Sequence, residues 1–134
     1  MRKFFPMFSS STKDIRVSVL PEYDVKNSMP SQQRFIFKYN IFIENFSSAS
    51  VKLLKRRWMI YDLANGYTEV KGDGVIGLLP EISPDQNFSY FSNVLLSSGI
   101  GHMSGSYLFE NLTSGEAFEV EIPRFELFAE VFTN

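Results

Sequence analysis

The stretch Arg34-Phe35-Ile36-Phe37-Lys38-Tyr39-Asn40-Ile41-Phe42-Ile43-Glu44 decides the fold class, because its side chains alternate with a period of two. One face carries the apolar residues Phe35, Phe37, Tyr39, Ile41 and Ile43, and the other carries Arg34, Lys38, Asn40 and Glu44. Such alternation is typical of a strand with one face in a core and one face in water. The stretch therefore predicts a long strand in a half-buried sheet.

The same period-two pattern recurs on both sides of this stretch. Short turn-rich segments separate the apolar runs, and Asn65-Gly66 is a strong hairpin signal because both residues tolerate positive φ. We expect further strands over residues 15–20, 51–61, 68–71, 88–96, 103–111 and 118–132. About seven to eight short strands with this spacing indicate an all-β antiparallel β-sandwich, with a barrel as the alternative.

The last expected strand changes phase at Pro123. Apolar residues occupy even positions from Phe118 to Ile122 and odd positions from Phe125 to Val131. Proline removes a hydrogen bond from a sheet ladder, so within sheets it is confined to edges and bulges. We therefore expect a β-bulge or a move between sheets at Pro123.

Size and composition fit a single domain with its own core. Of the 134 residues, 44% are hydrophobic, and we expect a flexible N-terminal arm over residues 1–13 followed by the sandwich over residues 14–134. The absence of cysteine excludes a disulfide scaffold, a cysteine-ligated zinc and a thiol nucleophile. No apolar run reaches the roughly 20 residues that span a bilayer. We therefore expect no membrane segment and a cytoplasmic location.

The segment Gly72-Asp73-Gly74-Val75-Ile76-Gly77 fits the Gly-x-Gly-x-x-Gly pattern of nucleotide-binding loops. That pattern needs a helix at its glycines, but Pro80 and Pro84 follow and make a continuous helix unfavourable. The acidic residue expected about 20 positions later is also missing. We expect a glycine-rich turn, with an anion-binding nest of backbone N–H groups, aided by Lys71, as the alternative.

Few residues could carry catalysis or hold a metal ion. His102 is the only histidine, and no serine motif accompanies it, so a catalytic triad is not expected. Glu119 and Glu121 share a strand face and could in principle hold Mg²⁺. A solvated outer face explains both carboxylates, because they alternate with apolar residues. We therefore expect no enzyme activity, no cofactor and no metal ligand.

One local basic cluster lies in a chain whose formal net charge is only −2. It consists of Lys52, Lys55, Arg56 and Arg57 and is followed by Trp58. Cations beside aromatic rings can bind nucleic acid, but a binder of that kind has an overall basic excess, so we do not expect nucleic acid as a partner. The structural interpretation that we prefer is a solvated strand on which Arg56 and Trp58 share a face and stack.

Several short motifs follow one another in a fixed order. They are Arg56-x-Trp58-x-Ile60, Asp62 with Gly66, Glu69-Val70-x-Gly72-x-Gly74-Val75-Ile76-Gly77-x-x-Pro80, Ile82-x-Pro84, Phe88-x-Tyr90-x-Ser92, Gly101-x-Met103-x-Gly105-x-Tyr107 and Phe118-x-Val120-x-Ile122-Pro123-x-Phe125-x-Leu127. This succession resembles the ApaG family, also called CorD, from about residue 15 to residue 131. Two departures are modest, because Pro84-Asp85 replaces a Pro-Gly turn and Ile76 replaces a valine.

The resemblance implies an immunoglobulin-like or fibronectin type III-like sandwich. It also implies a link to cobalt resistance and magnesium homeostasis, in a family whose molecular activity is unknown. Related domains in eukaryotic F-box proteins and in a polymerase-interacting protein imply protein–protein recognition. The pyrophosphate binding proposed for the family's glycine motif maps onto Gly72, Gly74 and Gly77. Fold analogy alone does not decide between these functions.

From the motifs and the resemblance we expect a non-enzymatic protein-interaction module. Its unknown protein partner would contact a surface around Arg56 and Trp58. The alternative is a phosphate, pyrophosphate or nucleotide binder that holds a phosphorylated small ligand on Lys71 and residues 72–77. Pairing of exposed sheet edges would produce a homodimer, which is a further alternative.

Overall fold

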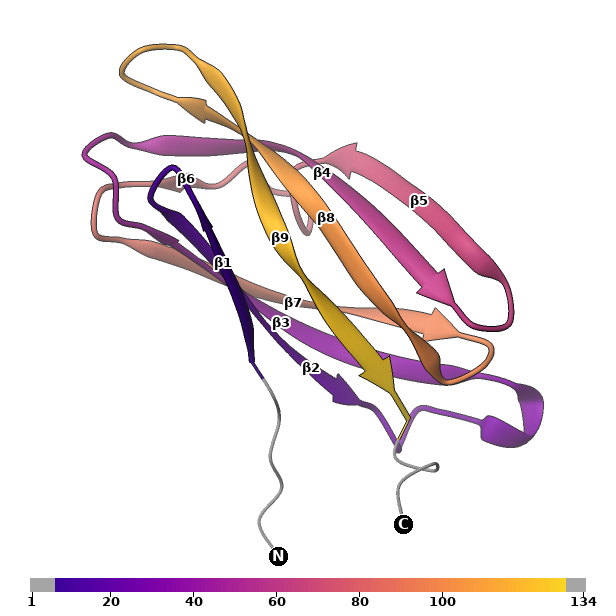
Figure 1. Ribbon diagram of the computed structural model, residues 1–134. Helices are drawn as coiled ribbons and strands as arrows, with labels where there is room; N and C mark the ends of the chain where they lie inside the picture. Colours follow the sequence, from indigo (N-terminus) through magenta and orange to yellow (C-terminus); the bar gives the residue numbers. More distant parts are fainter. Residues whose placement is uncertain (1–6, 130–134) are drawn as a thin grey trace, which may run out of the picture.

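The fold is a sandwich of two antiparallel sheets (Figure 1). The computed structural model describes residues 7–129. One sheet has four strands in the order β1-β2-β3-β7, and the other has five, in the order β5-β4-β8-β9 with the short β6 paired to β4. The elements in this part of the chain are β1 (Phe8–Thr12), β2 (Ile15–Tyr23), a 3-10 helix η1 (Pro30–Gln32), β3 (Phe35–Asn45), β4 (Val51–Asp62), β5 (Gly66–Asp73), β6 (Glu81–Ile82), β7 (Asn87–Leu96), β8 (Ile100–Asn111) and β9 (Ala117–Phe128).

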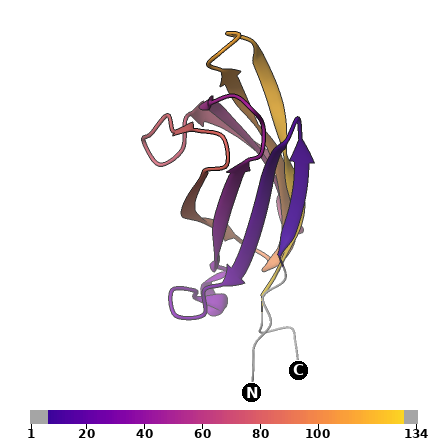
Figure 2. The same ribbon diagram turned by 90° about the vertical axis from the view of Figure 1, so that its left-hand side faces the viewer.

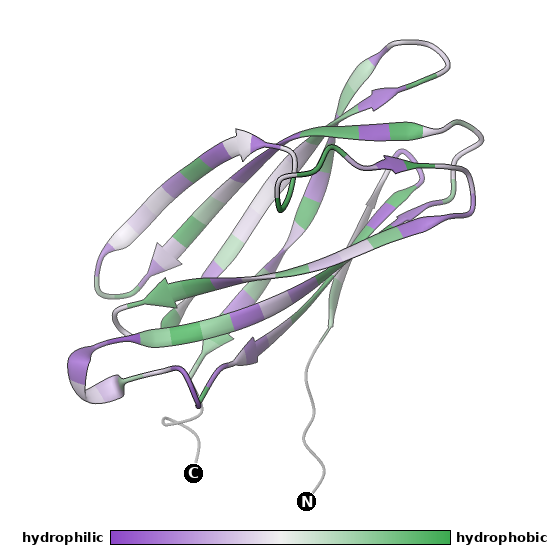
Figure 3. Ribbon diagram, turned by 180° about the vertical axis from the view of Figure 1, so that it is seen from behind, coloured by the Kyte–Doolittle hydropathy of each residue, from purple (hydrophilic) through white to green (hydrophobic). Residues whose placement is uncertain are grey.

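Strand β3 confirms the period-two prediction. All five apolar side chains of its inner face are buried, and the colour bands of Figure 3 show hydrophobic and hydrophilic residues following one another along the strands. β3 lies in the middle of its sheet, paired with β2 on one side and β7 on the other. The alternation predicted the strand because one face lines the core and the other meets water.

Aromatic rings join the two sheets at the centre of the core. The Phe125 ring lies 5.8 Å from the Tyr39 ring and 6.0 Å from the Trp58 ring, measured between centroids. Tyr39 and Trp58 meet edge to face at 5.5 Å. Aromatic pairs at these separations add to the burial energy, and truncating a buried ring costs about 3–5 kcal/mol. This three-ring cluster fixes β3, β4 and β9 relative to one another.

A bulge in β9 confirms the predicted irregularity at Pro123. Met103 of β8 faces Phe125, whereas Gly105 faces Ile122, so two residues of β9 oppose one residue of β8. The extra residue changes the parity of the strand. Apolar side chains on both sides of Pro123 therefore reach the core.

A tight hairpin joins β4 and β5 at Asn65-Gly66, as the sequence predicts. Gly66 has φ of 78°, and the carboxylate of Asp62 organises the turn. It accepts hydrogen bonds from Ala64 N at 3.1 Å, from Ser97 N at 2.7 Å and from Ser98 Oγ at 2.6 Å. Burial raises the pKa of Asp62, but these hydrogen bonds outweigh it, and the pKa lies below the ordinary 3.8. Asp62 thereby ties the β4–β5 turn to the β7–β8 turn.

The prediction of a flexible arm over residues 1–13 needs correction for residues 8–12. They form β1, which pairs with β2 from Phe8–Val19 to Thr12–Ile15. β1 also lies beside β9 (Figure 2), where Ser10 Oγ donates to the Glu121 carbonyl oxygen and Glu121 N donates to Thr12 Oγ1. Besides its ladder to β2, these hydroxyl contacts hold the strand, and its serine-rich segment lacks the usual alternation of apolar and polar residues. Residues 1–6 and the expected end of the last strand at residues 130–132 lie outside the described residues.

Candidate functional site

The glycine loop, residues 72–77, leaves the end of β5 and turns toward β6. Its N–H groups are used inside the fold: Gly74 N donates to Leu54 O at 2.8 Å, and Val75 N and Leu78 N exchange hydrogen bonds with each other's carbonyls at 2.9 Å. Ile76 and Gly77 form the turn between them, with φ of 45° and 77°. The loop is therefore a tight turn, as the sequence predicts, and not the start of a helix. A β-branched residue in this left-handed region is strained by about 1–2 kcal/mol.

Two glycines of the loop have a steric reason to lack a side chain. A Cβ atom on Gly74 would lie 1.9 Å from the Leu78 carbonyl oxygen. A Cβ atom on Gly72 would lie 2.6 to 2.8 Å from the guanidinium atoms of Arg56, which rests against the backbone there. The first glycine of the motif thus makes room for an arginine of the neighbouring strand.

Arg56 holds the loop but has no acidic partner. Its Nη1 donates to the carbonyl oxygens of Asp73 and Gly74, both at 2.9 Å. In the part of the chain that the structure describes, no carboxylate lies within ion-pair distance of Arg56, and its Nε and Nη2 make no hydrogen bond. The half-buried guanidinium therefore keeps its charge and part of its donor capacity available.

Arg56 opens into a cavity of about 360 Å³ between the two sheets, which we call the intersheet cleft. Three side chains of β4, at two-residue spacing, line one wall: Arg56, Trp58 and Ile60. Tyr39 of β3 and the β7 residues Tyr90, Ser92 and Val94 line the other wall, with Val70 and Ile76 contributing from β5 and the glycine loop. The cleft combines apolar and aromatic surface with a few polar groups, which is typical of binding sites.

The hydroxyl groups at the inner end of the cleft stay neutral. Tyr90 Oη and Tyr107 Oη lie 2.5 Å apart and are hydrogen-bonded. Burial raises the pKa of both tyrosines and that of Tyr39, so none of the three carries charge near neutral pH. Arg56 is therefore the only formally charged side chain that lines the cleft among residues 7–129.

The structure separates the other predicted site residues. Trp58 is only 4% exposed, and its ring is part of the core at the base of the cleft rather than on an open surface. Within residues 7–129, Arg56 does not stack on the Trp58 ring as the sequence suggested. Its guanidinium lies against Gly72 instead. Lys71 is exposed, and its Nζ lies 3.5 Å from Glu69 Oε1 rather than at the glycine loop.

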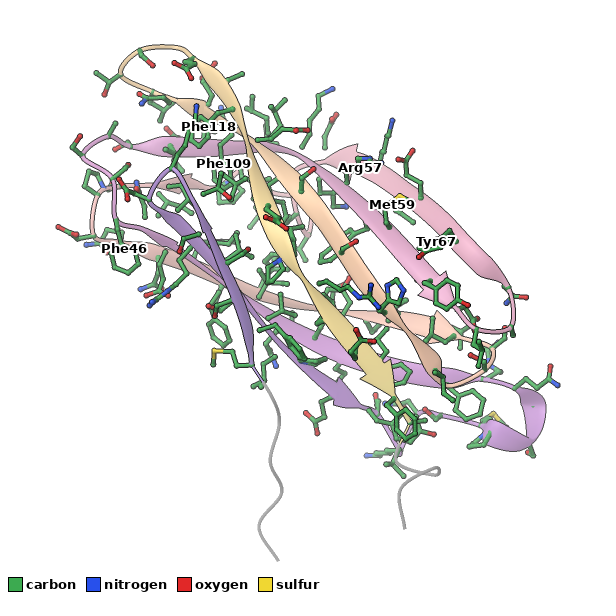
Figure 4. All side chains as sticks on the ribbon, in the orientation of Figure 1. Phe46, Arg57, Met59, Tyr67, Phe109 and Phe118 are labelled. Atoms are coloured by element: carbon green, nitrogen blue, oxygen red, sulfur yellow. The ribbon has the colours of Figure 1, made fainter. Side chains whose placement is uncertain are left out.

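The basic cluster is divided between the two faces of β4. Arg57 lies on the outer face of β4 and β5 (Figure 4), where its Nε is 2.7 Å from Glu69 Oε2. Lys55 Nζ is 3.9 Å from Asp73 Oδ1. Acidic neighbours thus offset these cations, which supports their interpretation as a solvated strand.

The candidate catalytic and metal residues do not come together. His102 packs on the Tyr61 ring at 4.9 Å on the outer face, and Glu119 and Glu121 face outward from β9. Within residues 7–129, no group of three histidine, aspartate or glutamate side chains is placed to hold a metal ion. The structure contains no helix, over the same residues, that is long and apolar enough to cross a membrane.

Sequence reasoning missed the role of β7 in the site. β7 pairs with β3 and with no other strand of the described chain, so its second edge is open. It contains no charged residue, no proline and no glycine over ten residues. Phe91 and Leu95 of this strand are 70% and 47% exposed. The lack of charge was visible in the sequence, but only the topology shows that it falls on an edge.

Comparisons with known proteins identify the family. The ApaG domain matches residues 25–111 of this chain. The protein ApaG of Rhodospirillum centenum is 42% identical over 121 residues, covering 90% of this chain and 92% of that protein. The ApaG of Chromohalobacter salexigens is 42% identical over 119 residues, covering 89% and 94%.

A solved structure agrees with this assignment. The crystal structure of an ApaA protein from Bordetella pertussis has a TM-score of 0.83 and 38% identity, and the match covers 87% of this chain and 94% of that one. A family match over more than half of the chain and relatives with about 40% identity over nearly all of it leave one assignment: the chain belongs to the ApaG family.

Proposed function

We propose that this domain is a non-enzymatic interaction module that binds an extended segment of a partner protein along the open edge of β7. The observation that carries the proposal is the ten-residue uncharged edge strand with Phe91 and Leu95 exposed. Natural sheets protect such edges with charge, proline or a covering element, because an open edge pairs readily with another chain. An edge left without these devices suits a partner strand.

The other edges of the same molecule show the contrast. β9 is covered by β1 through the hydrogen bonds of Ser10 and Thr12 to Glu121. β5 carries Glu69, Lys71 and Asp73, which place charge along its edge. β7 has neither protection among the described residues. Strand addition at β7 would use main-chain hydrogen bonds for affinity and adjacent pockets for specificity.

The intersheet cleft supplies such pockets. Its β7 wall consists of alternate residues Tyr90, Ser92 and Val94, so a strand added to this edge would direct every second side chain along the cleft. The link of the family to cobalt and magnesium would then be indirect, through the partner. Phosphate binding on residues 72–77 is the alternative function. It is the weaker proposal because three N–H groups of this loop region already have backbone acceptors.

Position-specific photocross-linking in cells tests the proposal. A photoreactive amino acid at Leu95 should capture one defined protein, and the same group at the exposed Phe128 of β9 should not. Adding Phe91→Lys to the Leu95 variant places charge on the β7 edge and should abolish the product. Equal capture from both positions, or cross-linking of Leu95 to a second copy of this chain, would contradict the proposal.

A further inference from the structure

Arg56 differs from the other arginines that line the two sheets. Arg16, Arg57 and Arg124 each lie within 3.1 Å of a glutamate carboxylate. Arg56 is more enclosed than these, yet its only hydrogen bonds are to two backbone carbonyls through Nη1. A charge withdrawn from water normally has a counter-charge, because desolvation is otherwise uncompensated. The cleft therefore contains a partly enclosed cation that has no carboxylate partner among residues 7–129.

The β4 wall of the cleft is charged at Arg56 and apolar beyond it. Arg56, Trp58 and Ile60 stand at positions i, i+2 and i+4 of β4 and all face the cleft. In an extended chain, side chains two positions apart lie roughly 6.6 to 6.8 Å from each other on one face. A segment in strand conformation has the same repeat. It can therefore set one side chain at Arg56 while the next on that face meets Trp58 and Ile60.

We propose that the segment bound at β7 carries an acidic residue two positions from a large apolar residue, in either order. This inference rests on the proposed function. The carboxylate would accept hydrogen bonds from the free Nε and Nη2 of Arg56, and the apolar side chain would fill the cleft beside Trp58 and Ile60. The tyrosine hydroxyls near Arg56 are neutral, so the carboxylate meets no opposing negative charge there.

Charge also distinguishes this occupant from a second copy of the chain. A homodimer formed through β7 would present the strand Asn87–Leu96, which has no acidic residue, to the same strand of the other copy. Arg56 would then remain without a carboxylate. An acidic partner segment satisfies the open edge and the unpaired guanidinium together.

Selection from a displayed library of random ten-residue peptides tests the proposal. Enriched peptides should contain an acidic residue two positions from an apolar one. Replacing that acid by its amide should weaken binding of a synthetic peptide by about tenfold or more, the value of a charge-assisted hydrogen bond.

Two variants of the protein separate charge from folding. Ser92→Asp adds a carboxylate to a β7 residue whose side chain faces the cleft and should weaken binding of the selected peptide by roughly tenfold, because like charges repel. Ser89→Asp makes the same change on the outer face of the same strand, away from the cleft, and should leave the affinity unchanged.

The peptide selection tests the acidic motif, and the cross-linking experiment tests the β7 interface. Enrichment of peptides without the acid, equal binding by Ser92→Asp and the unaltered protein, or no enrichment at all would each overturn the acidic motif. The Leu95 cross-link decides the β7 interface independently, so a partner captured there together with a failed peptide selection would leave the proposed function standing.

Discussion

Replacing Gly72 by alanine tests whether the first glycine of the motif exists to accommodate Arg56. Gly72 has ordinary strand geometry, so alanine is compatible with its backbone, and the nearest atoms to the new Cβ would be those of the Arg56 guanidinium at 2.6 to 2.8 Å. Arg56 would have to swing away. It would then lose the hydrogen bonds from Nη1 to the carbonyl oxygens of Asp73 and Gly74.

The expected loss in the free energy of unfolding follows from these two hydrogen bonds. Bonds that involve a buried charged group contribute about 1.5–3 kcal/mol each, but a typical hydrogen bond contributes about 1 kcal/mol, and we take about 1 kcal/mol for each bond because Arg56 is partly exposed to water. Gly72→Ala should therefore lower the free energy of unfolding by about 2 kcal/mol, with a fall in melting temperature of roughly 6–10 °C. In an Arg56→Ala background the same change should be neutral or stabilising by about 0.5 kcal/mol, because alanine restricts the unfolded chain more than glycine does.

A double-mutant cycle measured by urea unfolding gives the coupling between the two residues. We expect a coupling energy of about 2 kcal/mol for Gly72 with Arg56. Gly77 provides the matched control, because its φ of 77° makes alanine strained while nothing lies within 4 Å of a Cβ there. Gly77→Ala should therefore be additive with Arg56→Ala. Additivity of Gly72→Ala with Arg56→Ala would refute the steric explanation of the motif.

Three further outcomes can be measured on the purified protein. Asp62→Asn should flatten the acid limb of the stability curve in urea titrations between pH ~7 and pH ~3, since the lowered pKa of Asp62 contributes stability above about 3.8 that is lost as the pH falls through the folded value. Ile76→Asn should raise the free energy of unfolding by about 1 kcal/mol, because asparagine tolerates the φ of 45° that strains isoleucine; an unchanged or lower value would contradict the strain. Phe91→Lys should alter the melting temperature by less than about 2 °C, given the exposure of Phe91, while abolishing partner capture at β7.

Much of the fold could be predicted because local patterns agreed with the tertiary structure. The alternation in residues 34–44, the Asn65-Gly66 hairpin and the parity change at Pro123 each correspond to an observed strand, turn or bulge. β1 could not be predicted in this way. The Ser10 hydroxyl donates to Glu121 and the Thr12 hydroxyl accepts from it, across more than 100 residues of sequence, and periodicity does not predict such contacts.

The site was harder to predict, because its properties arise between strands. The motif drew attention to Gly72 and Gly74, but their role depends on Arg56 of the neighbouring strand. The hydroxyl pair of Tyr90 and Tyr107 joins opposite sheets. The adjacent residue Arg57 is also an arginine, but it faces outward and forms an ion pair with Glu69. Residue type alone therefore could not identify Arg56 as the arginine without an acidic partner.

The open edge and the unpaired cation have no explanation in stability. A lysine in place of Phe91 would protect β7 without touching the core, since that side chain is mostly exposed. An acidic residue on the cleft, at Ser92 for example, would offer Arg56 a counter-charge within the chain. In a domain selected only to fold, the first change would protect the open edge and the second would pair the charge of Arg56. Both features border the same cleft, and a single extended segment with an acidic side chain would satisfy both. Their coincidence therefore favours an external partner over a purely structural role.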